Sequence, residues 1–189
     1  VAPYLEVEPG QRVIDACAGA GGKTLHLASM MQNKGQLIAL DIYESKLKKL
    51  KVRARRNGVH NVETRVIDSN KVIKKLHTSA DRLLLDAPCS GLGVIKRNPD
   101  SKWKLEPEFI DRIMGVQQDI LQNYSKMLKK GGQMVYATCS ILPQENTEQV
   151  KKFLASEAGK EFELVRERNV YASETGFDGF YMALLKRDA

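Results

Sequence analysis

Residues 15–24 read DACAGAGGKT and begin within the apolar run RVIDA at 12–16. A buried strand that leads through a glycine-rich turn into a helix is typical of nucleotide-binding α/β domains. The turn ends in GKT, as a P-loop does, but Cys17 stands where a P-loop has its first glycine. Gly19 and Gly21 match the start of a dinucleotide fingerprint whose third glycine is missing. The turn therefore predicts the fold class and leaves its ligand open.

Short apolar runs alternate with helical patterns along the whole chain. We expect strands near 12–16, 36–41, 62–67, 82–86, 133–138, 162–166 and 180–186. We expect helices near 22–32, 44–57, 69–77 and 107–130, and a further helix from Pro143 to about 155. Glycines after the second and fourth of these helices, Gly58 and the pair Gly131-Gly132, indicate helix ends. The alternation predicts an α/β fold: a mostly parallel seven-stranded sheet with helices on both faces and an antiparallel last strand.

The composition is that of one soluble globular domain. The 189 residues are 42% hydrophobic and 28% charged, and no apolar run approaches membrane-spanning length. No signal-peptide pattern opens the chain, and three cysteines without a CxxC pair argue against a disulfide framework. We therefore expect a cytoplasmic protein. Because the chain begins at Val1, we expect residues 1–189 to be a single domain from a longer protein.

The positive charge of the chain is clustered. The net charge is +7, and residues 46–56 contain seven lysines and arginines and no acid. Such a run indicates a polyanionic partner or, about equally well, a solvated helix face. The three histidines stand apart without ligand spacing, so we expect no metal, and a monomer is the default expectation.

Each cysteine of the chain follows a predicted strand. Cys17 comes after the first strand, Cys89 after the fourth and Cys139 after the fifth. In an open α/β sheet, ligands bind beyond the carboxyl ends of the strands, where the strand order reverses. A Rossmann-like winding makes the first and fourth strands neighbours, with the fifth beside the fourth, so we expect the three cysteines at one crevice. Each of them taken alone could equally be a buried filler.

Aspartates follow the same rule. Asp15, Asp41 and Asp86 end predicted strands, and Asp68 lies just past one. Asp41 stands twenty residues after Gly21, where a carboxylate binds ribose hydroxyls in nucleotide sites. A helix cap is the alternative interpretation of such an aspartate. We favour ligand binding for Asp41, because it follows a glycine-rich first turn.

The connection at 87–106 is much longer than most strand-to-helix loops. Its glycines, prolines, Cys89 and basic residues favour a functional loop over a disordered one. The single tryptophan of the chain, Trp103, lies in it. This side chain could stack on a base, although packing within the long loop is the stronger expectation.

The turn at 15–24 also fits the D/E-x-G-x-G-x-G pattern of S-adenosylmethionine enzymes, with cysteine at the first glycine position. The rival interpretation is a P-loop NTPase, because RLLLD at 82–86 looks like a Walker B strand. The missing glycine removes a residue that a phosphate cradle needs, and a P-loop leaves Asp41, Cys89 and Cys139 unexplained. A methyl donor is therefore the favoured ligand.

Three motifs together resemble the Sun-type (NSUN, RsmB-like) RNA cytosine-C5 methyltransferases: DACAGAGGKT at 15–24, DAPCSGLG at 86–93 and ATCSILPQEN at 137–146. The ending DGFYMALLKR is similar to the last strand of that family, so the resemblance covers essentially the whole chain. One departure is Ala20, where many members carry proline. The resemblance implies a Rossmann-like methyltransferase fold, rRNA or tRNA as substrate, and RNA-binding domains in the longer protein.

The chemistry of this family explains the need for two cysteines. Carbon 5 of cytosine is too electron-poor to attack a methyl sulfonium until a thiolate adds at carbon 6. The resemblance makes Cys139 the nucleophile and Cys89 the group that assists product release. The residues alone leave this order open, since DNA cytosine-C5 methyltransferases attack with the cysteine of their PC motif. Asp86 would bind the amino group and ring nitrogen of the base, and Lys23 would reach the base or, alternatively, face solvent.

The resemblance also implies a cofactor-binding set, and the basic side chains themselves suggest an RNA-binding set. S-adenosylmethionine would be held, with Asp68 near the adenine, by Cys17, Ala18, Gly19, Ala20, Gly21, Gly22, Lys23, Asp41, Asp68 and Asp86. RNA phosphates would be contacted, in a salt-sensitive way, by Lys46, Lys96, Arg97 and Lys102. The target nucleotide would have to be extruded or single-stranded. A catalytically silent RNA-binding module of the same fold is the remaining alternative, and the intact cysteine pair argues against it.

Overall fold

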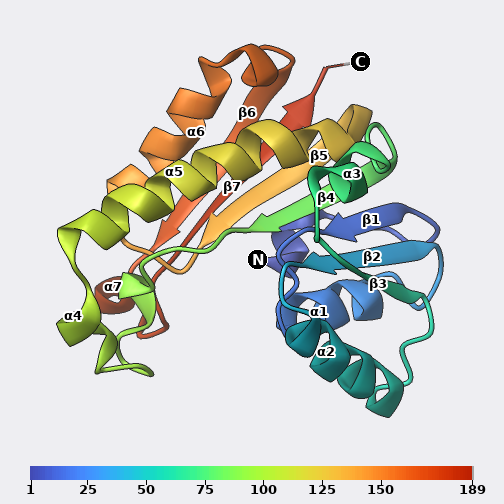
Figure 1. Cartoon of the computed structure of the whole chain (residues 1–189), viewed down its shortest axis with the longest axis horizontal. Coiled ribbons are helices and arrows are strands. Elements are labelled where there is room, and N and C mark those ends of the chain that lie inside the picture. Colours follow the sequence, from blue (N-terminus) through green and yellow to red (C-terminus); the bar gives the residue numbers. More distant parts are fainter. Residues whose placement is uncertain (189) are drawn as a thin grey trace.

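The computed structural model of the chain describes residues 1–188, apart from the side chain of Lys104, as one sheet wrapped by helices (Figure 1). The strands are β1 (Arg12–Asp15), β2 (Gln36–Asp41), β3 (Val62–Val66), β4 (Ala80–Asp86), β5 (Leu128–Thr138), β6 (Phe162–Val170) and β7 (Phe180–Arg187). Their order is β3-β2-β1-β4-β5-β7-β6, and all neighbours are parallel except the two pairs that β7 makes. The predicted Rossmann-like fold with a reversed last strand is confirmed.

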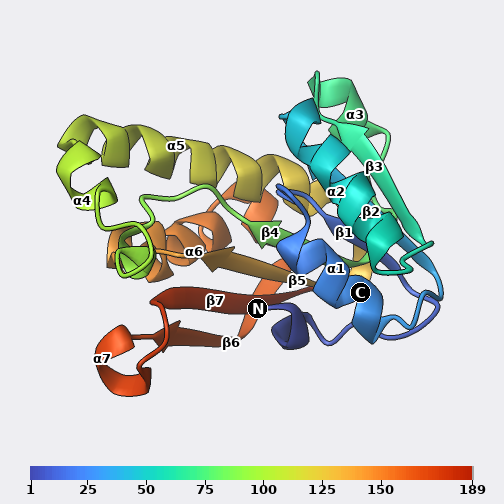
Figure 2. The same ribbon diagram turned by 90° about the horizontal axis from the view of Figure 1, so that it is seen from below.

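Helices cover both faces of the sheet (Figure 2). They are α1 (Gly22–Met30), α2 (Glu44–Arg56), α3 (Asn70–Lys74), α4 (Ser101–Lys104), α5 (Pro107–Tyr124), α6 (Thr147–Leu154) and α7 (Ala172–Thr175), with 3₁₀ turns η1 (Ala2–Leu5), η2 (Leu92–Val94), η3 (Ser125–Met127), η4 (Pro143–Glu145) and η5 (Glu157–Gly159). Residues of α3, α5 and α6 pack on one face, and those of η1, α1 and α2 on the other. Both views place α4 and α7 at the end of the molecule away from α2 and α3. No helix within residues 1–188 has the length and apolarity to cross a membrane.

Alternate strand residues build the two halves of the core. On β1, Val13 packs on the α1 side and Ile14 on the α5 side, and both are fully buried. The central β4 is apolar without alternation, because helices cover both of its faces: Leu83, Leu84 and Leu85 are all 0% exposed. At roughly 2 kcal/mol for each buried leucine, these strands contribute strongly to stability. The ends of β1, β4 and β5 are therefore held by a rigid core.

The helix predicted for 107–130 ends early, at Tyr124, and β5 begins at Leu128 instead of residue 133. The backbone amide of Ser79 donates to the carbonyl of Met127 over 2.9 Å. Leu128 pairs with Ala80 of β4, and the pairing resumes after a shift in register at Gln133 and Arg82. Pairing with β4 and the complete burial of Met127 and Leu128 outweigh the helical pattern of the sequence. The two glycines that follow lie inside β5 and end no helix.

Other segments also differ in extent from the prediction. Helix α3 covers 70–74 of the predicted 69–77, because the chain must turn back to enter β4. The helix predicted from Pro143 is divided into η4 and α6. The long connection at 87–106 contains η2 and α4, and β6 continues to Val170 because it pairs with β7 along its whole length.

We expect Gly21→Ala to destabilise the fold and Gly22→Ala to leave it nearly unchanged. Gly21 has φ +90°, and a Cβ there would lie 2.6 Å from Cγ of Leu50. Gly22 begins α1, and a Cβ there would meet no group outside its own turn. The free energy of unfolding in urea should fall by about 2 kcal/mol for Gly21→Ala and change by less than about 0.5 kcal/mol for Gly22→Ala. Equal stabilities of the two variants would contradict this account of the turn.

Candidate active site

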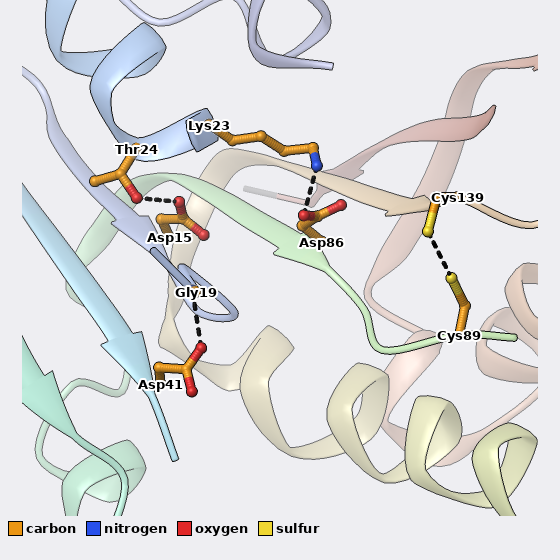
Figure 3. Close-up of polar contacts among 8 residues, drawn as sticks. All are labelled: Asp15, Gly19, Lys23, Thr24, Asp41, Asp86, Cys89 and Cys139. Carbon is orange, nitrogen blue, oxygen red and sulfur yellow. Dashed lines mark hydrogen bonds and ion pairs between the residues drawn. The ribbon is translucent and has the colours of Figure 1, made fainter. Parts of the chain in front are cut away.

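The strands β1, β4 and β5 end side by side, and the loops after them continue the hydrogen bonding of the sheet. The amide of Ala16 donates to the carbonyl of Leu84, and that of Ala87 to the carbonyl of Ala137, each over 2.9 Å. The backbone, and not a free loop, therefore positions the side chains that follow. Figure 3 shows the residues that lie at or near these strand ends: Asp15, Gly19, Lys23, Thr24, Asp41, Asp86, Cys89 and Cys139.

Cys89 and Cys139 face each other at this edge of the sheet (Figure 3). Their Sγ atoms are 3.2 Å apart, and both are free, partly buried thiols. Cys139 directly follows the last residue of β5, and Cys89 lies three residues after the end of β4. Cys17 lies instead in a neighbouring cavity, where burial raises the pKa of its thiol. The structure thus pairs two of the three cysteines that the sequence placed at one crevice.

The two paired thiols differ in acidity. The hydrogen bond with Cys89 lowers the pKa of Cys139. Burial and the nearby Asp86 carboxylate oppose this effect, and the Lys23 ammonium reinforces it. The same hydrogen bond, together with burial, raises the pKa of Cys89. This arrangement favours a thiolate at Cys139 that accepts a hydrogen bond from a protonated Cys89. The thiolate is the nucleophilic form of cysteine.

Lys23 extends from the first turn of α1 to the end of β4 (Figure 3). Its Nζ lies 2.6 Å from Oδ2 of Asp86, and the two side chains are 30% and 26% exposed. The lysine therefore does not simply face solvent, the alternative that the sequence had left open. Burial raises the pKa of Asp86, and the lysine opposes that rise. An ammonium and a carboxylate thus lie next to the cysteine pair.

A cavity of about 510 Å³ lies beside these groups, between the 15–24 turn, the end of β2 and α5. This volume is within the range of small-molecule sites, and apolar side chains make up most of its wall. Asp41 fixes the turn from this wall: its Oδ2 accepts from the amide of Gly19 and its Oδ1 from that of Tyr43, each over 2.8 Å. Each carboxylate oxygen keeps a lone pair for a ligand. Among residues 1–188 no cluster of three or more histidine, cysteine or acidic side chains could hold a metal ion.

Asp15 lies directly behind the turn and is completely buried. Its Oδ2 accepts a hydrogen bond from the Thr24 hydroxyl over 2.7 Å, and its Oδ1 has no partner within the described residues. Burial raises the pKa of this carboxyl to about 7. The folded protein therefore holds the Asp15 proton far more tightly than an unfolded chain, where the pKa is about 3.9.

Only part of the predicted cofactor set reaches the cavity. From the turn, Cys17 and Gly19 line it, whereas the wall does not include Ala18, Ala20, Gly21, Gly22 or Lys23. The carbonyl of Ala20 instead accepts a hydrogen bond from Arg53 of the basic helix α2 over 2.8 Å. Asp68 is exposed and does not line the cavity, although its neighbours Ile67 and Asn70 do. The chain turns its side chain outward just past the end of β3.

The four predicted RNA contacts lie in two separate places. Lys46 lines the cavity, with its Nζ 4.5 Å from the centre of the Tyr43 ring. The other three, Lys96, Arg97 and Lys102, are exposed on the loop before α5, where Arg97 pairs with Asp178 at 2.6 Å. Trp103 is 80% exposed, so the expectation that it packs within the loop is wrong. Its ring contacts Lys102, whose Nζ is 4.8 Å from the ring centre.

The wall that α5 contributes to the cavity has no counterpart among the predicted residues. Val116, Ile120 and Tyr124 line it, together with the polar Asp119 and Asn123. The helical spacing of these residues is visible in the sequence. It does not indicate which strand ends lie under this face of α5. That depends on how α5 crosses the sheet.

Comparison with known proteins agrees with this geometry. The profile of the family described as 16S rRNA methyltransferase RsmB/F matches residues 2–186. Ribosomal RNA small subunit methyltransferase B of Vibrio vulnificus is 39% identical over 193 residues, 98% of this chain and 44% of that protein. Its probable Bacillus subtilis counterpart is 37% identical over 171 residues, 90% of this chain and 38% of that protein. The chain therefore spans about two-fifths of the length of these relatives.

A solved structure of NSun6 from Pyrococcus horikoshii is also similar. Its TM-score is 0.88 at 30% identity, over 100% of this chain and 50% of that one. That structure was determined with SFG, an analogue of S-adenosylmethionine. The likeness extends over every element described above.

We expect stability to fall as the pH rises from about 4 to about 7, and Asp15→Asn to remove much of that fall. In this window the unfolded chain has lost the Asp15 proton while the folded chain still holds it, so raising the pH favours unfolding. At about 1.4 kcal/mol per pKa unit, the contribution is on the order of 4 kcal/mol. Urea denaturation of both proteins across this window measures it. Parallel pH profiles of wild type and variant would contradict the assignment.

Proposed function

The chain belongs to the RsmB/F family of 16S rRNA methyltransferases, and we propose that its site transfers a methyl group from S-adenosylmethionine to carbon 5 of a cytosine in RNA. The observation that carries this proposal is the Cys89–Cys139 pair, with its sulfur atoms 3.2 Å apart beside a ligand-sized cavity. Addition to a pyrimidine ring requires a nucleophile and the later elimination requires a base, and two thiols of unlike acidity can supply both. The P-loop alternative loses its support, because the family match covers residues 2–186.

The cavity suits S-adenosylmethionine in size and in chemistry. Asp41 offers lone pairs for ribose hydroxyls, and Ile42 and Ile67 offer apolar surface for the adenine. Gly19, at φ +56° and without a side chain, allows a ligand to approach the turn closely. When bound, S-adenosylmethionine supplies an electrophilic methyl group. Asp68 is not part of this proposal, because Ile67 and Asn70 take its place in the wall.

Cys139 begins the reaction by adding its sulfur to carbon 6 of the cytosine. Its thiolate is stabilised chiefly by the hydrogen bond from Cys89, and the ammonium of Lys23 offsets part of the repulsion from Asp86. The carbon–sulfur bond forms as the 5,6 double bond breaks, and the displaced electron pair makes carbon 5 nucleophilic toward the methyl group. Asp86, held by Lys23, would accept a hydrogen bond from the amino group of the base, and in its protonated form would donate to the ring nitrogen.

Cys89 completes the reaction. Once Cys139 is bonded to carbon 6 it is a neutral thioether, and it no longer raises the pKa of Cys89. The Cys89 thiol therefore loses its proton to solvent more readily in the adduct than in the free protein. As a thiolate it can accept the proton of carbon 5, whose electron pair restores the 5,6 double bond and expels the Cys139 sulfur. The product then carries the methyl group, and both cysteines are regenerated.

We propose ribosomal RNA as the substrate class, because the curated relatives are named for it. The exposed loop with Lys96 and Lys102 can reach phosphates, and the ring of Trp103 can stack on an unpaired base. Arg97 is already paired with Asp178 and would hold the loop in place. The remaining three-fifths of the relatives' length would contribute additional RNA-binding domains.

RNA carrying 5-fluorocytosine should trap the wild-type protein, in the presence of S-adenosylmethionine, as a covalent complex on a denaturing gel. Fluorine at carbon 5 cannot leave as a proton does, so the adduct cannot resolve. Cys139→Ala should form no complex. Cys89→Ala should form one, and should also accumulate a complex on ordinary cytosine because its release step is blocked. The longest available form of the protein is the right one to use.

The behaviour of the two variants in that gel decides between the roles. A complex absent only with Cys89→Ala would keep the reaction and exchange the two cysteines. No complex from any form, with RNA and cofactor binding both measured and intact, would favour the silent RNA-binding module.

Replacing Lys96 and Lys102 together by alanine should make RNA binding less dependent on salt. Removal of one phosphate interaction reduces the slope of log K against log salt by roughly 0.7 to 1, so we expect the loss of two to reduce it by roughly 1.4 to 2. Fluorescence anisotropy with a cytosine-containing single strand at several salt concentrations gives this slope. Lys71→Ala with Lys74→Ala, two exposed lysines on α3 at the opposite end of the molecule, is the matched control. Identical slopes for the two double variants would argue against the loop as an RNA contact.

A further inference from the structure

One buried carboxylate connects the two cysteine loops from behind. Glu145, at the end of η4, is 0% exposed. Its Oε2 accepts hydrogen bonds from the hydroxyls of both Ser90 and Ser140, which directly follow the two cysteines in the chain. Its Oε1 accepts from the amide of Ser90 over 2.7 Å. The loops that carry Cys89 and Cys139 therefore share one acceptor group.

The two loops contact each other through two pairs of side chains. The sulfur atoms of Cys89 and Cys139 meet on one side, and the hydroxyls of Ser90 and Ser140 meet on the other, 3.2 Å apart. Glu145 binds both hydroxyls on that second side. Its position therefore controls how far the two loops, and with them the two sulfur atoms, can separate.

Helix α5 is tied into the same cluster. The Gln117 amide nitrogen donates to Oε1 of Glu145 and to the carbonyl of Pro88, each over 3.0 Å. Within the described residues Glu145 forms no ion pair, so four hydrogen-bond donors take the place of a cation. A buried charge is costly unless it is hydrogen-bonded in this way. Such a group is a strong restraint because separating any of its partners leaves the carboxylate unsatisfied.

We propose that Glu145 is a positioning residue, which acts through Ser90 and Ser140 to hold Cys89 and Cys139 against the same base. This role rests on the proposed reaction, in which one cysteine adds to the ring and the other must reach the adjacent carbon. Its negative charge lies close enough to Cys89 to contribute to the raised pKa of that thiol. Glu145 touches neither sulfur by hydrogen bonding, so its effect is on geometry and charge and not on bond formation.

Glu145→Gln is the first test, because it keeps the shape of the side chain. The amide that replaces Oε2 is a donor and cannot accept the two serine hydroxyls. We expect kcat per folded molecule to fall about tenfold, equivalent to about 1.4 kcal/mol. The affinity for RNA in the absence of S-adenosylmethionine and the calorimetric affinity for S-adenosylmethionine should stay unchanged, because Glu145 does not line the cavity. A covalent complex should accumulate on ordinary cytosine, as in Cys89→Ala, because the second cysteine is misplaced.

Gln118→Leu is the matched control for the removal of a buried polar interaction alone. The Gln118 amide donates to the carbonyl and side chain of Gln149, and both residues are buried without a hydrogen bond to Glu145 or to the two serines. Gln118→Leu should lower the free energy of unfolding, while kcat per folded molecule and the amount of covalent complex stay at the wild-type level. The double variant Ser90→Ala with Ser140→Ala removes the same two hydrogen bonds from the other side, and should reproduce the effect of Glu145→Gln even if that variant folds poorly.

The outcomes separate this role from the reaction itself. A wild-type protein that forms no adduct with 5-fluorocytosine RNA would remove the proposed reaction and the role with it. A wild-type adduct together with unchanged kcat and no accumulated complex in both serine and glutamate variants would remove only the role of Glu145. A fall in kcat that comes with an equal loss of cofactor affinity would also overturn it, because that is a general defect of the fold.

Discussion

Parallel pairing of β1 with β4, and of β4 with β5, is the constraint on which the site depends. It brings three strand ends, Asp15, Asp86 and Thr138, to one edge of the sheet although they are far apart in the chain. The strands are buried from both faces, so the hydrophobic core sets the position of this edge. The loops add only short extensions, which are held by backbone hydrogen bonds. The side chains at this edge are therefore held in place by the rigid core.

Behind the edge, polar groups replace apolar packing. The Thr138 hydroxyl donates to the side chain of Asn146, whose amide donates to the carbonyl of Ser140 over 3.0 Å. The hydroxyl of Tyr136 donates to the carbonyl of Glu145 over 2.8 Å. Unsatisfied groups of this kind would be expensive in a buried corner, so each contact helps to specify one conformation. The hydrogen bonds within the ATCSILPQEN segment thus restrain the position of Cys139.

Electrostatics then distinguishes groups that look alike in the sequence. Asp15 and Asp86 both end strands, but Asp15 is completely buried with a hydroxyl partner, whereas Asp86 is paired with the ammonium of Lys23. Cys89 and Cys139 are likewise similar in sequence context, and the hydrogen bond between them makes their pKa values diverge, with Lys23 favouring the Cys139 thiolate against Asp86. One lysine from α1 therefore affects both the carboxylate and the nucleophile.

Local patterns in the chain were enough to predict the fold class, the point where the strand order reverses and the motifs that carry the cysteines, because apolar periodicity and turn glycines are local properties. Only the tertiary structure decided that α5 ends early and forms a wall of the cavity, that Lys23 reaches Asp86, and that Trp103 is exposed. It also decided that Glu145 lies behind both cysteines, although the motif containing it is visible in the sequence. Each of these depends on contacts between segments distant in the chain, which a local pattern does not encode.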